Sequence, residues 1–328
     1  MQEPTKLLSI IIPIYNVAAY ISKAAHSVSQ QAFPGLEVVL IDDGSTDDSL
    51  KICQEILRGV DVVTVTQENM GLSCARNAGL TIASGEYVMF LDADDFLLPS
   101  ALTNILSALE PDSPDVLFGR YLRFTPKTGL LPGMPYDFNP PSCTMQRTEY
   151  ILGSLPEPSW NAWRYVCNRR FLLENNLFFE PGILCEDVPW TLTLLETAKT
   201  IEFMQAPFYA YFQRRPGSIM SSVNPKRITD LNQILTRLLI RYKDRPVLCR
   251  ILVWQSFFYI NEYANIPNSE KTKVWASYKK TMPHYIQSPS LLHKLMGKCQ
   301  NRLLFTFTSR SMNLIKNARR WYKYKHIQ

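Results

Sequence analysis

Three aspartates follow a short apolar run in the first third of the chain. Asp92, Asp94 and Asp95 lie directly after residues 87–91, which read Tyr-Val-Met-Phe-Leu. Such a run is typical of a strand buried on both faces of a parallel sheet, and open α/β sheets bind ligands at the carboxyl ends of their strands. Carboxylates this close repel one another unless a cation neutralises them, and Mg²⁺ or Mn²⁺ takes oxygen ligands that it often shares with phosphates. The pattern predicts a metal–diphosphate site; the alternative is an acidic turn before a helix that starts near Pro99.

Polar and aromatic residues also follow two earlier apolar runs, at Tyr15 and at the Asp42–Asp43 pair. Carboxyl ends of parallel strands meet at one edge of a sheet, so we expect these side chains to lie near the three aspartates. A carboxylate can accept a hydrogen bond from the imide N–H of a base, and Tyr15 can stack on that base. Arg76 can offer its planar fork to a carbonyl or a phosphate. Each residue alone is more often structural, and their joint occurrence carries the prediction.

The elements that must position these residues alternate between strands and helices. Apolar runs predict strands at 8–14, 37–41, 60–66 and 87–91, and helical spacing or helix-capping residues follow the first three. This alternation predicts an α/β fold with a doubly wound, mostly parallel, Rossmann-like sheet. Further along, the pattern predicts strands at 115–124 and 201–213, helices at 168–175 and 188–198, a loop or lid at 125–141, and helices from about 225.

Composition favours an ordinary globular protein. The chain has 328 residues, of which 46% are hydrophobic and 20% charged, and this length predicts two domains. Its seven cysteines form no CxxC pair or Cys/His metal spacing, which favours a reduced, cytosolic setting. No apolar run approaches the ~18 residues of a membrane span.

The end of the chain is strongly basic. Glu270 is the last acid, and 13 bases follow it, so the preceding part holds 35 − 13 = 22 bases against 29 acids. Apolar residues between Leu291 and Phe307 share one helical face, and residues 319–325 interleave bases with aromatics. This pattern predicts a helix that contacts an anionic membrane surface. Nucleic acid is the rival anionic partner and is not expected; an ordinary basic face packed on the catalytic domain is the other alternative.

Four motifs in the first part of the chain together resemble the family 2 glycosyltransferases of GT-A fold. They occur in that family's order and spacing, and the resemblance is strong over about residues 5–120. It extends loosely to about 220 through Glu186-Asp187 and the segment 215–219. The matching pieces are Ser9–Asn16 (SIIIPIYN), Ile41–Asp47 (IDDGSTD), Gly71–Leu80 (GLSCARNAGL) and Leu91–Asp95 (LDADD, the DxD motif).

The resemblance implies a metal-dependent, inverting transfer of a hexosyl or N-acetylhexosaminyl group from a nucleotide-sugar, usually a UDP-sugar. The acceptor would be a hydroxyl of a saccharide, in particular a lipid-linked one, in cell-surface polysaccharide synthesis at the cytoplasmic face of the membrane. Asp187 would be the catalytic base and Asp94 the ligand of Mn²⁺ or Mg²⁺, with Asp95, Glu186 and Arg215 as further site candidates. Nucleotide contacts would come from Pro13, Tyr15, Asp42, Asp43, Arg76 and Asp92.

The sequence predicts a catalytic domain over residues 1–224, with a nucleotide half at about 1–120 and an acceptor half at about 121–224. A helical, basic region at 225–328 would follow. One rival function is a nucleotidyltransferase of similar fold, which should carry a Gly-rich, basic loop after the first strand; residues 14–18 read Ile-Tyr-Asn-Val-Ala. The other is a nucleotide-sugar-binding protein that has lost catalysis, and the presence of both Asp94 and Asp187 argues against it.

Overall fold

The computed structural model describes residues 6–110, 113–132, 144–153, 160–213, 223–260, 263 and 266–285. The chain divides into two compact units. Met1–Tyr150 and Ser159–Arg215 form the first, and Ile151–Pro158 and Pro216–Gln328 form the second. The predicted division into a catalytic domain and a basic helical region is a statement about function and stays a prediction.

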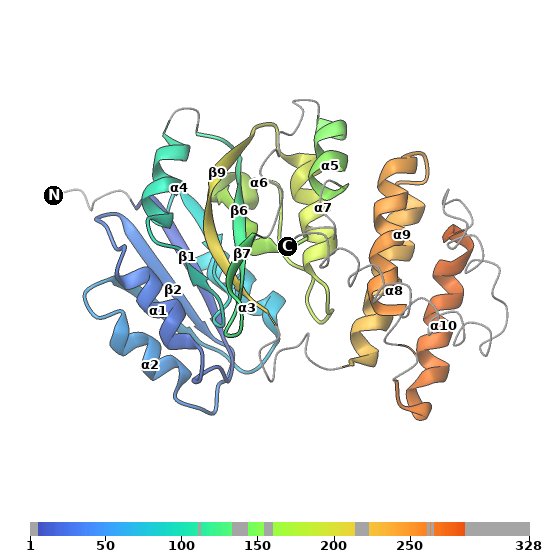
Figure 1. Ribbon diagram of the computed structural model, residues 1–328, viewed down its shortest axis with the longest axis horizontal. Coiled ribbons are helices and arrows are strands. Elements are labelled where there is room, and N and C mark those ends of the chain that lie inside the picture. The colour runs from blue at the N-terminus through green and yellow to red at the C-terminus, as the bar shows by residue number, and fades with distance from the viewer. Residues whose placement is uncertain are drawn as a thin grey trace. The chain divides into compact units, whose positions relative to one another are not determined.

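The first unit is built on a sheet whose first four strands run parallel (Figure 1). Their order is β3-β2-β1-β4, and every residue of β1, β2 and β4 is buried, as the apolar runs predict. The pairing of Ile14 with Asp42, and of Ile11 with Phe90, brings the carboxyl ends of β1, β2 and β4 to one edge. The strands are β1 (Leu8–Ile14), β2 (Leu36–Asp42), β3 (Asp61–Thr66) and β4 (Tyr87–Phe90).

Helices cover both faces of this parallel part. The apolar side of α1 (Ile21–Ser29) joins the core that contains Ile10, Ile12 and Ile14, and α2 (Ser49–Ile56) adds Cys53 to the same core. On the other face, α3 (Leu72–Ile82) lies so close to β1 that a Cβ on Gly79 would be 2.3 Å from the Ile11 side chain. The sheet is therefore doubly wound, in agreement with the prediction.

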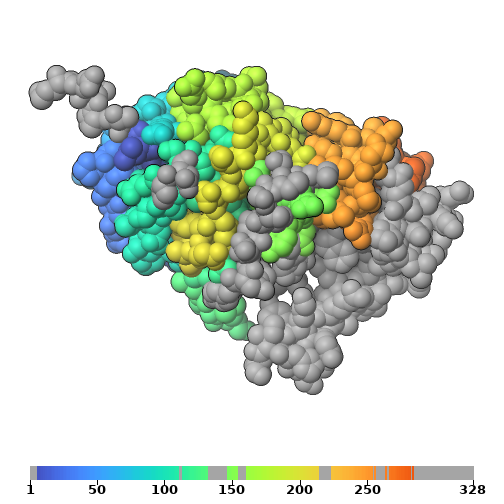
Figure 2. All heavy atoms as spheres, turned by 90° about the horizontal axis from the view of Figure 1, so that it is seen from above, coloured from blue at the N-terminus to red at the C-terminus, as the bar shows by residue number. Residues whose placement is uncertain are grey.

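Beyond β4 the sheet becomes mixed. β8 (Tyr165–Asn168) runs antiparallel to β4, and β6 (Val116–Thr125) runs antiparallel to β8 and parallel to β9 (Ile201–Phe212). Two short strands complete it, β5 (Phe96–Leu97) beside β9 and β7 (Gly129–Pro132) beside β6. β9, yellow in Figure 2, reaches the surface of the unit along part of its length. The helical elements of this half are α4 (Ala101–Leu109), α5 (Thr144–Gly153), η1 (Ala162–Arg164), α6 (Arg169–Glu174) and α7 (Asp187–Thr197).

Sequence patterns located β6, β9, α6 and α7 but not β8, η1 or the hairpin strand β7. β7 occupies part of the segment predicted as a loop or lid, and residues 133–143 of that segment lie outside the described residues. β8 is only four residues long and is buried between β4 and β6, so it leaves no periodic signal in the sequence.

From residue 223 on, the described part of the second unit is mostly helical, with α8 (Pro225–Arg241), α9 (Pro246–Ile260) and α10 (Asn268–Tyr285), which confirms the predicted helical C-terminal part. Asn224 caps α8 by accepting hydrogen bonds from the backbone N–H groups of Lys226 and Arg227. Hydroxyl and amide groups link α8 to α10, as in the Asn232–Ser277 and Thr236–Thr281 pairs. None of the helices described is long and apolar enough to cross a membrane. The predicted membrane-binding tail lies beyond the described residues.

Candidate active site

The loop after β1 is pinned to the loop after β2, which leaves the ring of Tyr15 at the surface. The Asn16 side chain accepts a 2.8 Å hydrogen bond from the Thr46 backbone, and the backbone N–H of Val17 donates to Ser49 Oγ at 2.7 Å. Tyr15 is 50% exposed, whereas Pro13 is buried inside β1. An exposed ring on a fixed backbone suits stacking on a flat ligand.

Asp42 and Asp43 are buried at the end of β2 and have different partners. Asp42 Oδ1 accepts from the Ser45 N–H at 3.0 Å, which closes the turn of the acidic motif. Asp43 accepts from the backbone N–H groups of Met70 and Gly71, both at 2.9 Å, and so holds the loop that leads into α3. Gly71 has a φ of +86°, a conformation that favours glycine. Asp43 also accepts from Gln67 Nε2 at 2.7 Å, and because a carboxylate offers about four lone-pair sites, one of them remains for a ligand N–H.

The three aspartates after β4 separate into two kinds. Asp92 and Asp94 are half-buried at the edge of the sheet, whereas Asp95 is 1% exposed and points toward β9. Asp95 accepts 2.7 Å hydrogen bonds from the Tyr209 hydroxyl and the Phe212 backbone N–H. Burial, together with the charges of Asp94 and Asp92, raises the pKa of Asp95 well above its ordinary value. Asp95 therefore fixes the acidic turn to β9, and Asp92 and Asp94 form its open part.

Asp92 and Asp94 are the carboxylates of this turn that a divalent ion could reach. The described residues include no group of three or more His, Cys, Asp or Glu side chains arranged to hold a metal. Mg²⁺ is usually held by one or two carboxylates plus substrate phosphates rather than by an all-protein cage. The half-buried carboxylates of Asp92 and Asp94 fit that donor set, in which the ligand supplies the remaining oxygens.

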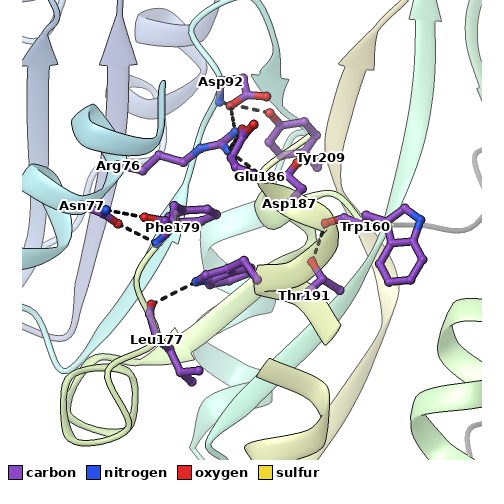
Figure 3. A network of polar contacts seen from close by, with 11 residues as sticks. Arg76, Asn77, Asp92, Trp160, Leu177, Phe179, Glu186, Asp187, Thr191 and Tyr209 are labelled. Atoms are coloured by element: carbon purple, nitrogen blue, oxygen red, sulfur yellow. Dashed lines mark hydrogen bonds and ion pairs between the residues drawn. The ribbon is translucent and has the colours of Figure 1, made fainter. Parts of the chain in front are cut away.

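Arg76 lies between Asp92, which follows β4, and the acidic pair Glu186 and Asp187 at the start of α7. Figure 3 shows its guanidinium between Asp92, Glu186 and Asp187. Arg76 Nη2 lies 2.8 Å from Asp92 Oδ1, and Nη1 lies 2.9 Å from both Glu186 Oε1 and Asp187 Oδ1. We predicted that Arg76 lines a nucleotide pocket; in this structure it is 1% exposed and its terminal nitrogens are directed at carboxylates.

One guanidinium facing three carboxylates leaves an excess of negative charge in a buried place. Burial raises the pKa of Asp187 to about 7, because the lowering by Arg76 is offset by repulsion from Glu186 and Asp92. Burial likewise raises the pKa of Glu186 against the influence of Arg76. The Asp187 side chain is 20% exposed. A partly accessible carboxylate with a pKa near neutrality is suited to accept a proton from a hydroxyl.

Tyr209 is a residue of this site that sequence patterns missed. Besides donating to Asp95, the Tyr209 hydroxyl accepts from the Asp92 N–H at 3.2 Å. The Trp163 ring stacks on the Tyr209 ring, with centroids 4.3 Å apart. The aromatic run at 208–212 predicted a strand, but which ring of that run reaches the acidic turn depends on the pairing of β5 with β9. Arg215, a further site candidate, lies outside the described residues.

Comparison with known proteins identifies this arrangement. Residues 9–162 match the sequence model of Glycosyl transferase family 2. This segment belongs to glycosyl transferase family 2. The uncharacterized glycosyltransferase YibD of Escherichia coli K12 is 29% identical over 216 residues, which cover 65% of this chain and 63% of YibD. The cholesterol galactosyltransferase of Borreliella burgdorferi is 28% identical over 233 residues, covering 66% of this chain and 63% of that protein. The chain thus spans less than two thirds of the length of these relatives.

Solved structures share the fold of this chain. TarS residues 1–349 of S. aureus, in complex with UDP-GlcNAc, align with a TM-score of 0.71 and 22% identity, over 94% of this chain and 92% of that one. The mannosyltransferase PcManGT of Pyrobaculum calidifontis, with GDP-Man and Mn²⁺, gives a TM-score of 0.55 at 16% identity, over 97% and 90% of the two chains. The TarS likeness confirms the predicted GT-A fold.

Proposed function

We propose that the chain is a metal-dependent, inverting glycosyltransferase that moves a hexosyl or N-acetylhexosaminyl group from a UDP-sugar to a hydroxyl of a saccharide acceptor. The observation that carries this proposal is the meeting of Asp92 with Glu186 and Asp187 around Arg76. That cluster lies at the sheet edge where β1 and β2 also present Tyr15, Asp42 and Asp43. The domain at 1–224 would carry the reaction.

The nucleotide would occupy the carboxyl ends of β1 and β2. Tyr15 would stack on the uracil, Asp42 or Asp43 would accept from its imide N–H, and Asp92 would reach the ribose. Pro13 would shape the strand beneath the base. UDP and UDP-GlcNAc complexes of TarS, which has the same fold, support a UDP donor.

Asp94, with Asp92 beside it, would hold Mn²⁺ or Mg²⁺ together with the diphosphate. When bound, the ion would stabilise the negative charge that develops on the leaving diphosphate. The chain's own contribution is to fix the acidic turn, through the bonds of Asp95 to Tyr209 and Phe212, so that Asp94 stays at the open edge. The Mn²⁺ complex of PcManGT supports a divalent ion in this fold.

Asp187 would act as the base. The acceptor oxygen attacks the anomeric carbon from the face opposite UDP, the bond from that carbon to the UDP oxygen breaks, and Asp187 takes the hydroxyl proton. Removing the proton as the new bond forms avoids a positively charged oxygen in the product. Arg76 holds Asp187 in place, and Glu186, which shares Arg76 Nη1, keeps the pKa of Asp187 from falling too low for a base.

The acceptor would be a lipid-linked saccharide in cell-surface polysaccharide synthesis, met at the cytoplasmic face of the membrane. Relatives named as a cholesterol galactosyltransferase and a poly(ribitol-phosphate) beta-glucosyltransferase support a lipid or a polymer bearing hydroxyl groups. The 13 bases after Glu270 would hold the enzyme on anionic lipid.

A donor panel tests the proposal. Calorimetric titration of UDP-, GDP- and dTDP-sugars, each with and without Mn²⁺, should show binding of a UDP-sugar that depends on the ion. A matched titration of Tyr15→Ala should lose affinity, whereas Tyr150→Ala should not. Equal, ion-independent binding of all three donors, or no binding of any, would rule out the proposed donor and metal.

A further inference from the structure

Helix α3 contacts the acidic pair by two routes that start at consecutive residues. The first is the set of ion pairs made by Arg76. The second starts at Asn77, whose Nδ2 donates to the Phe179 carbonyl and whose Oδ1 accepts from the Phe179 N–H, both at 2.8 Å (Figure 3). The Asn77 side chain thus pairs with both backbone polar groups of Phe179, as a neighbouring strand would.

Phe179 in turn holds helix α7. Its ring stacks on the Trp190 ring with centroids 4.6 Å apart and planes 13° apart, and Trp190 Nε1 donates to the Leu177 carbonyl at 3.0 Å. Both rings are buried, and the Arg76 guanidinium lies 5.2 Å above the Phe179 ring. Trp190 is one helical turn after Asp187, the first residue of α7. The contacts therefore form a closed circuit from α3 through residues 177–179 to α7 and back through Asp187 to Arg76.

We propose that Asn77 is a positioning residue that, through Phe179 and Trp190, sets the place of the Asp187 carboxylate relative to the Arg76 guanidinium. This inference rests on the proposed role of Asp187 as the base. Asn77 lies on the far side of Phe179 from α7 and contacts none of the three carboxylates through a hydrogen bond described here. Its effect on the reaction would pass entirely through the circuit.

The electrostatics of the site explain why a small displacement matters. The charged and titratable groups that face Asp187 are Arg76 of α3, the adjacent Glu186, Asp92 after β4 and Tyr165 of β8. Arg76 is the one cation among these four, and the attraction between two charges falls as their separation grows. If α7 moves away from α3, Asp187 loses stabilisation of its ionised form while burial and its acidic neighbours still oppose that form. Its pKa then rises and fewer molecules hold an ionised base at neutral pH.

The test is the Asn77→Ala variant of the full chain, which removes both bonds to Phe179. We expect kcat to fall roughly tenfold to a hundredfold, since a misplacement of about 1 Å can cost about 100-fold. The acidic limb of the kcat/KM profile should move to higher pH. UDP affinity with Mn²⁺ should stay within twofold of wild type, because Tyr15, Asp42 and Asp94 lie outside the circuit.

Two further variants keep the test decisive. Trp190→Phe keeps the stacked ring but removes the bond to Leu177, so it should shift the same pH limb in the same direction without altering α3. Because the two bonds belong to one circuit, the double variant should lose less kcat than the product of the single losses. Asn175→Ala is the matched control, since the Asn175 side chain donates a similar 2.8 Å bond to the Phe171 carbonyl at the exposed end of α6.

The inference is overturned if Asn77→Ala and Trp190→Phe keep the wild-type pH profile and kcat, as the control should. It is also overturned if Asn77→Ala loses UDP affinity as much as turnover with the pH limb unmoved, because Asn77 would then support the fold in general. The proposed function fails separately, if Asp187→Asn itself retains turnover.

Discussion

One buried glutamate and a cluster of three acids lie at opposite ends of the parallel strands, and the pKa of Glu37 is lowered whereas the pKa of Asp187 is raised. At the amino end of β2, Glu37 accepts hydrogen bonds from Lys6 Nζ at 2.7 Å, from Ser9 Oγ at 2.6 Å, and from both the backbone and the hydroxyl of Ser84. At the carboxyl end, Asp187 accepts one backbone hydrogen bond, from Ala162, and shares a single guanidinium with Asp92 and Glu186. Burial disfavours charge at both ends, so burial does not distinguish them.

The number of donors for each carboxylate makes the difference. Burial raises the pKa of Glu37, but the bonds from Lys6, Ser9 and Ser84 outweigh it and bring the value to about 2. At Asp187 burial, together with repulsion from Glu186 and Asp92, outweighs the influence of Arg76, and the pKa rises to about 7. A carboxylate with many hydrogen-bond donors stays ionised and stabilises the fold, whereas a buried carboxylate with few donors takes up a proton more readily. The acid at the amino end of the strands therefore contributes to stability, whereas the raised pKa of Asp187 at the carboxyl end suits acid–base chemistry.

Among substitutions at the two ends of the sheet, we expect the largest effect at the acidic turn formed by Asp92–Asp95. Asp94→Ala removes a half-buried carboxylate at that turn, so Mn²⁺-dependent UDP binding should be lost and transfer nearly abolished. Isothermal titration and a transfer assay measure the two effects. Asp48→Ala, which removes an exposed acid before α2, should change neither. Wild-type UDP affinity in Asp94→Ala with Mn²⁺ would show that the ion is held elsewhere.

The next effect concerns stability at the saturated end. The folded pKa of Glu37 is lowered, so its contribution is present above the unfolded value of 4.5 and is lost as pH falls toward about 2. Glu37→Gln should therefore lower the free energy of unfolding by roughly 3 kcal/mol at pH 7, the cost of breaking a buried ion pair. Urea unfolding of variant and wild type should converge as the pH approaches 2. Glu55→Gln, at an exposed acid of α2, is the control, and a gap that persists at pH 2 would contradict the assigned cause.

The smallest effect has the opposite sign. The folded pKa of Asp187 is raised, so its contribution is most favourable below the unfolded value of 3.8 and is lost as pH rises through about 7. Asp187→Asn cannot ionise and should gain stability relative to wild type at pH 8, with no gain at pH 4. Urea unfolding at the two pH values measures this. A lower free energy of unfolding for the variant at pH 8 would mean that Arg76 stabilises the ionised form of Asp187 as fully as Lys6, Ser9 and Ser84 stabilise that of Glu37.

The sequence predicted the parallel half of the fold because its information is local. Residues 8–14, 36–42 and 87–90 are fully buried, mostly apolar strands, and the polar residues after them had to meet at one edge. What local patterns could not supply was the partner of each acid. Arg76 meets residues 110 and 111 positions further along the chain, and Asp95 meets Tyr209 across 114 positions.

Glu37 illustrates the same limit from the other side. In the sequence it is a polar residue near the start of an apolar run, with no sign that Lys6, Ser9 and Ser84 would surround it. Asp42, Asp92 and Asp187 look equally acidic in the sequence. Only the fold shows which carboxylates are supplied with donors and which are left short of them.

The most direct test of the account is turnover of Asp187→Asn measured beside its UDP affinity. Asparagine keeps the shape of the side chain but cannot take the acceptor proton, so kcat should fall by roughly 10²–10⁴-fold. UDP affinity with Mn²⁺ should remain at the wild-type value, because a base that acts only in the transition state contributes nothing to donor binding. Turnover above a tenth of wild type, with the fold intact, would contradict the claim that the undersupplied end of the sheet is the catalytic one.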